Sequence, residues 1–245
     1  IESLRYGENP HQKSSIYVSD FNDQSLGMHK ISGKELSYNN YGDIYASLDI
    51  LASVDSKPAT VIIKHANPCG VSTNISPIVS FKNAFKSDPT SAFGGVIACN
   101  YKIDTKLAKE INKNFLEVIL AKGFDREALL ILKKKKNLRI VDISRYKQKN
   151  KTMIKKFDKS FLIQEKDKII FNKKEIKFVT KIKPTKKDLK EMEFAFNICK
   201  FVKSNAIVLT NNFSTIGIGA GQPSRLDSCK IATQKAKKFQ PKMIK

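Results

Sequence analysis

Apolar residues recur at helical spacing and in short β-branched runs along the first part of the chain. Residues 42–54 (GDIYASLDILASV) have the period of an amphipathic helix, and ATVII at 59–63 follows as a short buried strand. Ser76 and Pro77 suit the N-cap and the first position of a helix that extends to about Lys86. The pattern therefore predicts a helix, a strand and a second helix.

The alternation continues to about residue 145. Further strands are expected at 96–100, 117–121 and 138–143, and further helices at 104–115 and 125–135. Asp104 suits the N-cap of the first of these two helices. Helices that alternate with apolar strands are typical of an α/β fold, so we expect a largely parallel sheet covered by helices. Residues 1–145 would form a first structural unit.

The pattern changes between residues 146 and 184, where lysines become frequent and shorter alternating runs appear. KIIFN (168–172) and IKFVT (176–180) predict hairpin-like strands in this segment, which we interpret as a basic connecting region.

Residues 185–245 repeat the plan of the first unit. Thr185, with an aspartate three residues on, is expected to cap a helix that ends near residue 203, and AIVLT (206–210) predicts a buried strand. The glycine-rich NNFSTIGIGAGQPSR (211–225) is expected to be a loop that leads into a helix from Pro223. The shared order of helix, apolar strand, polar turn and helix suggests a duplicated α/β architecture with an incomplete second unit.

The composition is that of a globular protein. Of the 245 residues 41% are hydrophobic and 15 are Phe, and no run reaches the roughly 18 apolar residues of a membrane span. The N-terminus has no signal-peptide pattern and does not begin with Met, so we expect upstream sequence to be missing or removed. The four cysteines include no C-x-x-C pair, which favours reduced thiols and a cytoplasmic location.

The net charge of +22 comes mainly from lysine, because the 45 basic residues include only five arginines. Proteins that read nucleic acids place Arg and stacking aromatics on one face, whereas these lysines mostly occupy polar positions of amphipathic segments. A solvated basic surface is the simpler interpretation, and a field that attracts anionic small molecules is compatible with it. Nucleic-acid binding is the main alternative function, and it predicts a strongly salt-dependent affinity.

The stretch IIKHANPCGVS (62–72) places Lys64 and His65 at the end of a predicted strand. In open parallel sheets the carboxyl ends of the strands commonly carry the functional groups. A turn that begins at His65 would bring both side chains to one crevice, where His suits proton transfer and Lys suits stabilisation of an oxyanion. A polar strand end without a function is the alternative that spacing alone leaves open.

The same stretch does not fit a zinc site. A zinc deaminase needs H-x-E and then P-C-x-x-C, but Asn67 stands in place of the glutamate and Ser72 in place of the second cysteine. Cys69 has no other support as a nucleophile and is interpreted as a small buried thiol. We therefore predict no catalytic metal. A zinc-dependent nucleoside deaminase is a second alternative function, which the finding of stoichiometric zinc would support.

Two other stretches combine groups that bind anions. LRYGENPHQ (4–12) contains Arg5 beside a tyrosine, and a guanidinium pairs with phosphate or carboxylate through two hydrogen bonds. GIGAGQPSR (217–225) differs from the dinucleotide-binding G-x-G-x-x-G, but glycines ahead of a helix can bring backbone N–H groups to an anion, and Arg225 would add charge. A capped turn and a plain tight turn are the respective alternatives.

Six motifs in consistent order resemble one family, and they are LRYGENPHQ, KELSYNNYGD (34–43), IIKHANPCGVS, DPTSAFGGVIA (88–98), VKSNAIVLT (202–210) and TIGIGAGQPSRLDS (215–228). Together they look like the formyltransferase domain of the bifunctional purine biosynthesis enzyme, whose activities are 5-aminoimidazole-4-carboxamide ribonucleotide (AICAR) formyltransferase and IMP cyclohydrolase. The resemblance covers nearly the whole chain and is weakest at 140–185. It implies a cytidine-deaminase-like fold of three-layer αβα units, duplicated within the domain and without catalytic zinc.

The resemblance further implies formyl transfer from the co-substrate 10-formyltetrahydrofolate to the 5-amino group of AICAR, on the route to IMP. His65 resembles the base that takes the amine proton, and Lys64 the cation near the formyl oxyanion. The other positions that match nucleotide contacts or supporting site residues of the family are Arg5, Tyr6, His11, Gly94, Glu117, Asn205 and Arg225. Implied partners are the two small-molecule substrates and a second copy of the chain, with no nucleic acid and no membrane.

Two departures from the family pattern affect these expectations. The cyclohydrolase domain that precedes this region in the family, and the C-terminal portion that helps to bind folate, have no counterpart in the 245 residues. The resemblance therefore implies a fragment that is inactive or barely active alone. Near-normal formyl transfer by the 245-residue chain would contradict that expectation.

Overall fold

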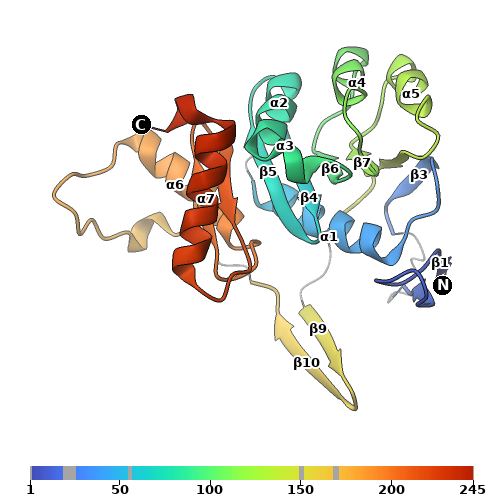
Figure 1. The fold of residues 1–245 in the computed structure, drawn as a ribbon, viewed down its shortest axis with the longest axis horizontal. Helices are drawn as coiled ribbons and strands as arrows, with labels where there is room; N and C mark the ends of the chain where they lie inside the picture. Colours follow the sequence, from blue (N-terminus) through green and yellow to red (C-terminus); the bar gives the residue numbers. More distant parts are fainter. Residues whose placement is uncertain (1, 19–25, 55–56, 149–151, 168–170, 245) are drawn as a thin grey trace.

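A computed structural model describes residues 2–18, 26–54, 57–148, 152–167 and 171–244 (Figure 1). Its α-helices are α1 (Tyr38–Ser53), α2 (Pro77–Ser87), α3 (Pro89–Ala92), α4 (Thr105–Ile111), α5 (Arg126–Lys133), α6 (Lys186–Cys199) and α7 (Arg225–Phe239). Short 3₁₀ turns cover Lys173–Glu175 and Pro241–Met243. Its strands are β1 (Glu2–Leu4), β2 (Ser14–Ile16), β3 (His29–Ser32), β4 (Ala59–Lys64), β5 (Asn67–Thr73), β6 (Val96–Cys99), β7 (Val118–Ala121), β8 (Arg139–Asp142), β9 (Thr152–Phe157), β10 (Ser160–Glu165), β11 (Ile207–Thr210) and β12 (Thr215–Gly219). No helix in these ranges has the length and apolar character that crossing a bilayer requires.

The long helices predicted from periodicity are confirmed, with shifted ends. The first begins at Tyr38 because Ser37 and Asn40 form a capping box, in which each side chain accepts a hydrogen bond from the other residue's backbone N–H. Asp104 caps α4 as expected, and Thr185 begins α6 through the predicted capping box. Ser76 precedes α2 but makes no side-chain cap hydrogen bond.

Six strands form a mixed sheet in the order β3-β8-β7-β6-β4-β5. Only the pairs β6–β7 and β7–β8 are parallel in this sheet, so the expected largely parallel sheet is wrong. The main reason is that β4 and β5 form a hairpin, and strands joined by a two-residue turn are antiparallel. β4 also pairs antiparallel with β6, and β3 pairs antiparallel with β8.

Helices cover both faces of the sheet, which gives three layers (Figure 1). Along β4, Val61 and Ile63 pack into one core cluster with α1 and α6, whereas Ile62 packs into a second cluster with α2, α4 and α5. All three side chains are fully buried. Alternate residues of one strand therefore stabilise both layers, each burial contributing roughly 1.5–3 kcal/mol.

The composition of the glycine-rich segment predicted a loop throughout. Instead, Thr215–Gly219 forms the buried strand β12, which pairs antiparallel with β11. A Cβ at Gly219 would lie 1.9 Å from the Ser228 carbonyl oxygen, and one at Gly217 would lie 2.1 Å from that of Ala232. The glycines thus allow α7 to pack directly on the strand. The preceding strand, β11, is only half-buried, contrary to the expectation for 206–210.

Residues 185–245, the predicted second unit, contact the predicted first unit, residues 1–145, at the edge strand β5. Ser72 forms an antiparallel bridge with Ser214, and their hydroxyl oxygens lie 2.7 Å apart. The Thr215 hydroxyl accepts a hydrogen bond from the Val71 backbone N–H at 2.9 Å. These groups are buried, so the polar seam fixes the register of the two units.

The basic connecting region contains a hairpin, but at other residues than predicted. β9 and β10 pair antiparallel, whereas IKFVT is not a strand and KIIFN lies partly outside the described residues. Asp158 in the turn has a positive φ of 43°. The hairpin projects from the body of the protein (Figure 1), and every residue of both strands is exposed. Lysines interrupt its apolar alternation, which is why the pattern missed it.

Candidate functional site

The hairpin between β4 and β5 turns at His65 and Ala66, the two residues between the strands. Both have positive φ angles, 54° and 57°, as the central residues of a type I′ turn do. The turn that the sequence suggested does begin at His65, and it is short, because Asn67 already belongs to β5. The reversal presents Lys64 and His65 at one end of the sheet.

Lys64 is held beside Gly94. Its Nζ donates a hydrogen bond to the Phe93 carbonyl oxygen at 2.6 Å, and a Cβ added at Gly94 would lie 3.9 Å from this nitrogen. Gly94 has a φ of 71°, which favours glycine, and Phe115 closes the other side of it. Because β4 is antiparallel to β6, this site lies where the parallel strands begin and not at their carboxyl ends.

Glu117 immediately precedes β7 at the same edge of the sheet. Its Oε2 accepts a hydrogen bond from the Asn40 side chain at 3.0 Å and lies 3.7 Å from Nη1 of Arg139. The Arg139 guanidinium is buried and also donates twice to the Glu35 carbonyl oxygen. Burial lowers the pKa of Arg139, while the charge of Glu117 raises it. Glu117 is thus a partly exposed carboxylate with a fixed position.

The N-terminal segment packs next to this cluster. The Tyr6 carbonyl oxygen accepts a hydrogen bond from the Tyr38 backbone N–H at the start of α1, and the Arg5 guanidinium lies 5.3 Å from the centre of the Tyr6 ring. The charge of Arg5 also acts on the pKa of Arg139, lowering it. His11 is exposed on a turn closed by a hydrogen bond from the Gly7 backbone N–H to the Gln12 carbonyl oxygen.

Asn205 and Arg225 form a separate group in the second unit. The Asn205 side-chain amide donates to the carbonyl oxygens of Gln222 and Pro223, at 3.0 and 2.8 Å. The carbonyl oxygen of Asn205 accepts from the Ser228 hydroxyl. Arg225 is the first residue of α7 and is exposed. Asn205 therefore fixes the loop that leads into the helix on which Arg225 stands.

A cavity of about 410 Å³ connects the two units. Lys64 and His65 line it from the first unit, and Gln222 and Lys235 line it from the second. Asp88 lies in its wall and pairs with Lys235 at 2.7 Å. Burial alone would raise the pKa of Asp88, but hydrogen bonds from Lys235 and Ser91 together hold it below its ordinary value. The cavity therefore combines a His, two lysines and a carboxylate.

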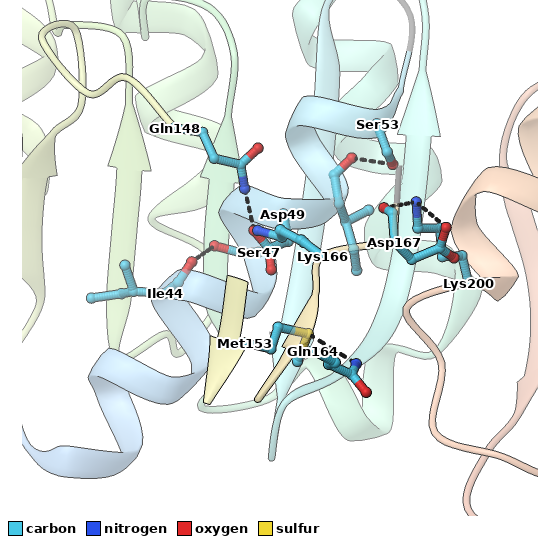
Figure 2. Close-up of polar contacts among 11 residues, drawn as sticks. Ile44, Ser47, Asp49, Ser53, Gln148, Met153, Gln164, Lys166, Asp167 and Lys200 are labelled. Atoms are coloured by element: carbon cyan, nitrogen blue, oxygen red, sulfur yellow. Dashed lines mark hydrogen bonds and ion pairs between the residues drawn. The ribbon is translucent and has the colours of Figure 1, made fainter. Parts of the chain in front are cut away.

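A second cavity, of about 610 Å³, also reaches His65 and includes Lys155 of β9 and Lys203. Figure 2 shows how its surroundings are held: Gln148 and Lys166 point toward Asp49 of α1, and Lys200 points toward Asp167. These contacts attach the base of the projecting hairpin to α1 and α6. The turn at His65 is thus accessible from two cavities.

Cys69 lines the smaller cavity, yet burial raises the pKa of its thiol to about 12, so it is a poor nucleophile. The four cysteines of the chain are free thiols. The described ranges contain no group of three or more His, Cys, Asp or Glu side chains that could hold a metal ion.

Sequence reasoning singled out Lys64, His65 and Glu117 but missed three groups that hold them. Asn40 and Arg139 contact Glu117, and Asp43 contacts the turn at Ala66. Asn40 and Asp43 lie within the quoted motif KELSYNNYGD, and Arg139 is one of only five arginines. The motif and the scarcity of arginine were the available signals, but neither showed which residue each of these side chains contacts.

Comparison with known proteins places these residues in a family context. The family model described as "AICARFT/IMPCHase bienzyme" matches residues 1–235. Proteins named "Bifunctional purine biosynthesis protein PurH" are similar over nearly the whole chain. That of Nostoc sp. (strain PCC 7120) is 43% identical over 237 residues, which are 96% of this chain and 47% of the relative. That of Persephonella marina is 40% identical over 243 residues (97% of this chain, 47% of the relative), and that of Buchnera aphidicola subsp. Schizaphis graminum is 46% identical over 241 residues (96% of this chain, 46% of the relative). The chain thus spans about half the length of the curated relatives it matches.

Proposed function

Because this chain belongs to the AICARFT/IMPCHase bienzyme family, we propose that it carries the formyl-transfer site of that family. The reaction is transfer of the formyl group of 10-formyltetrahydrofolate to the 5-amino group of AICAR, in purine biosynthesis. The observation that carries the proposal is the two-residue turn that holds Lys64 and His65 together at a cavity shared by both units. The cyclohydrolase activity in the family name is not assigned to any residue here.

The amine of AICAR is a weak nucleophile because it is conjugated with the carboxamide-bearing ring, so its reaction needs a base and a cation. A bond forms from the amine nitrogen to the formyl carbon, and the bond from that carbon to N10 of the folate breaks. His65 takes the proton that the amine loses, and protonation of the leaving N10 balances it. Lys64 stabilises the negative charge that develops on the formyl oxygen. Its bond to the Phe93 carbonyl oxygen fixes the ammonium for this task.

We assign the nucleotide side of the site to the residues around the sheet edge and the α7 N-terminus. Arg5 and Arg225 supply guanidinium groups suited to phosphate, and Glu117 supplies a hydrogen-bond acceptor. The remaining proposed contacts are Tyr6, Gly94 and Asn205, with His11 as a supporting residue. The support is that Gly94 and Glu117 lie at the same sheet edge as Lys64, while Asn205 fixes the loop before Arg225.

For the fold we propose two cytidine-deaminase-like units, at 1–145 and 185–245 with the second incomplete, joined by the basic region at 146–184. Supporting this, α1, β4, β5 and α2 have the same order and antiparallel pairing as α6, β11, β12 and α7. We also propose a homodimer, a cytoplasmic location and no catalytic metal. The four free cysteines support the location.

The test is formyl transfer by the intact gene product and its variants. Lys64→Ala and His65→Ala should each lower kcat by about 100-fold or more, the range expected for loss of a general base or an oxyanion donor. Lys106→Ala, on the exposed face of α4, is the control and should keep wild-type activity. Wild-type rates in both site variants would overturn the assignment. Tight, salt-dependent RNA binding without saturable AICAR binding would favour the nucleic-acid alternative.

A further inference from the structure

Asp43 of α1 contacts the turn that carries His65, although 23 positions separate it from Ala66. Its Oδ1 accepts a hydrogen bond from the Ala66 backbone N–H at 2.6 Å. The backbone of His65 also hydrogen-bonds this carboxylate. One side chain thus binds both residues of the turn.

This turn needs an external partner because of its residue types. The left-handed region disfavours residues with a Cβ, and type I′ turns therefore usually contain Asn-Gly or a similar pair. Here the two positions are His and Ala, with φ angles of 54° and 57°. The local sequence does not favour this conformation, and the hydrogen bonds to Asp43 stabilise it from outside.

The surroundings of Asp43 place it within the site. Burial raises the pKa of the Asp43 carboxyl, and the backbone N–H groups of Ala66 and His65 act in the opposite direction. The charge of His65 also lowers this pKa, and that of Glu117 raises it. The charges of the proposed base and of the proposed nucleotide-binding carboxylate therefore both act on Asp43.

We propose that Asp43 is a positioning residue, which holds the His65–Ala66 turn in its left-handed conformation and so fixes the imidazole of His65 relative to Lys64. The role rests on the proposed function. It acts through the backbone, without contact with substrate.

The experiment compares Asp43→Ala and Asp43→Asn with the wild-type intact gene product. A displacement of about 1 Å can cost about 100-fold in rate, so Asp43→Ala should lower kcat by about 10- to 100-fold while the KM for AICAR stays within about twofold. Asp43→Asn retains an acceptor oxygen and should lose less. Hydrogen exchange at the Ala66 backbone N–H is measured in the wild type and in Asp43→Ala, and it should be faster in Asp43→Ala.

Two further variants separate positioning from general stability. Asp104→Ala removes a comparable carboxylate bond, 2.7 Å to the Leu107 backbone N–H at the start of α4, and should keep kcat. Ala66→Gly in the Asp43→Ala background should recover kcat by at least about threefold, because glycine adopts a positive φ without steric cost.

The outcomes are distinguishable. Wild-type protein without formyl transfer overturns the proposed function, and the role of Asp43 falls with it. Active wild-type protein with an unchanged kcat in Asp43→Ala overturns the positioning role alone. An equal loss in Asp104→Ala, or unchanged exchange at Ala66, likewise overturns it. Loss of kcat with faster exchange and recovery by Ala66→Gly supports it.

Discussion

Replacing Asp88 by alanine removes a buried carboxylate from the contact between the two units. Its side chain is only 4% exposed, and it accepts hydrogen bonds from the Ser91 backbone N–H and hydroxyl in addition to pairing with Lys235 of α7. The first of these bonds caps the short helix α3. The variant therefore loses a helix cap and an inter-unit ion pair together.

The expected loss of unfolding free energy is about 3 kcal/mol. Removing an Asp N-cap costs roughly 1 kcal/mol, and a charge-assisted hydrogen bond contributes roughly 1.5–3 kcal/mol. We take about 2 kcal/mol for the ion pair, because the Lys235 side chain is 34% exposed and water screens it. In a chain of this size 1 kcal/mol moves Tm by about 2–4 °C, so Tm should fall by about 6–12 °C.

Urea unfolding of Asp88→Asn, Lys235→Met and the double variant measures the pair itself. Asn retains the cap, so the cycle should yield a coupling energy of at least about 1 kcal/mol. The pKa of Asp88 is lowered in the folded protein, so its stabilisation is present above about pH 4 and is lost as pH falls further. The difference between wild type and Asp88→Asn should therefore shrink below about pH 4. Additive single variants, or a loss below about 1 kcal/mol in Asp88→Ala, would refute this reasoning.

Two further predictions concern packing and thiol reactivity. Gly219→Ala should destabilise the protein by about 3 kcal/mol, because the added Cβ would lie 1.9 Å from the Ser228 carbonyl oxygen. Gly42→Ala should instead stabilise α1 by about 0.5–1 kcal/mol, because a Cβ added there meets no atom within 4 Å. Urea unfolding measures both, and equal effects would contradict the packing argument. Iodoacetamide at pH 8 should modify the exposed Cys229 but not Cys69 or Cys99, since burial raises the pKa of both thiols to about 12. Peptide mass spectrometry reads the sites, and rapid labelling of Cys69 would show that it is not buried.

Much of the helical structure could be predicted from the sequence, because helix signals are local. The capping box at Thr185, the cap at Asp104 and the apolar period of 42–54 each lie within a few residues of the backbone they determine. The candidate pair Lys64 and His65 is also local, being two neighbours at the end of an apolar run. Its resemblance to a family motif agrees with the family to which the chain belongs.

Strand direction and the glycine-rich segment could not be predicted in the same way. An apolar run of four or five residues indicates burial but contains no information on whether its neighbour runs parallel or antiparallel. Thr215–Gly219 has loop composition, yet it is a strand paired with β11, and its two glycines lie where α7 packs too closely for a side chain.

By itself, the sequence determined the helices and most of the buried runs and singled out the candidate site residues, since periodicity and side-chain type are properties of neighbouring residues. Only the tertiary structure decided which distant groups hold that site. The Asn40 amide binds Glu117 across 77 positions, and Asp43 binds the turn at His65 and Ala66. Such contacts depend on how the helices pack on the sheet. The residues next to a side chain in the sequence do not show which distant residue it will contact.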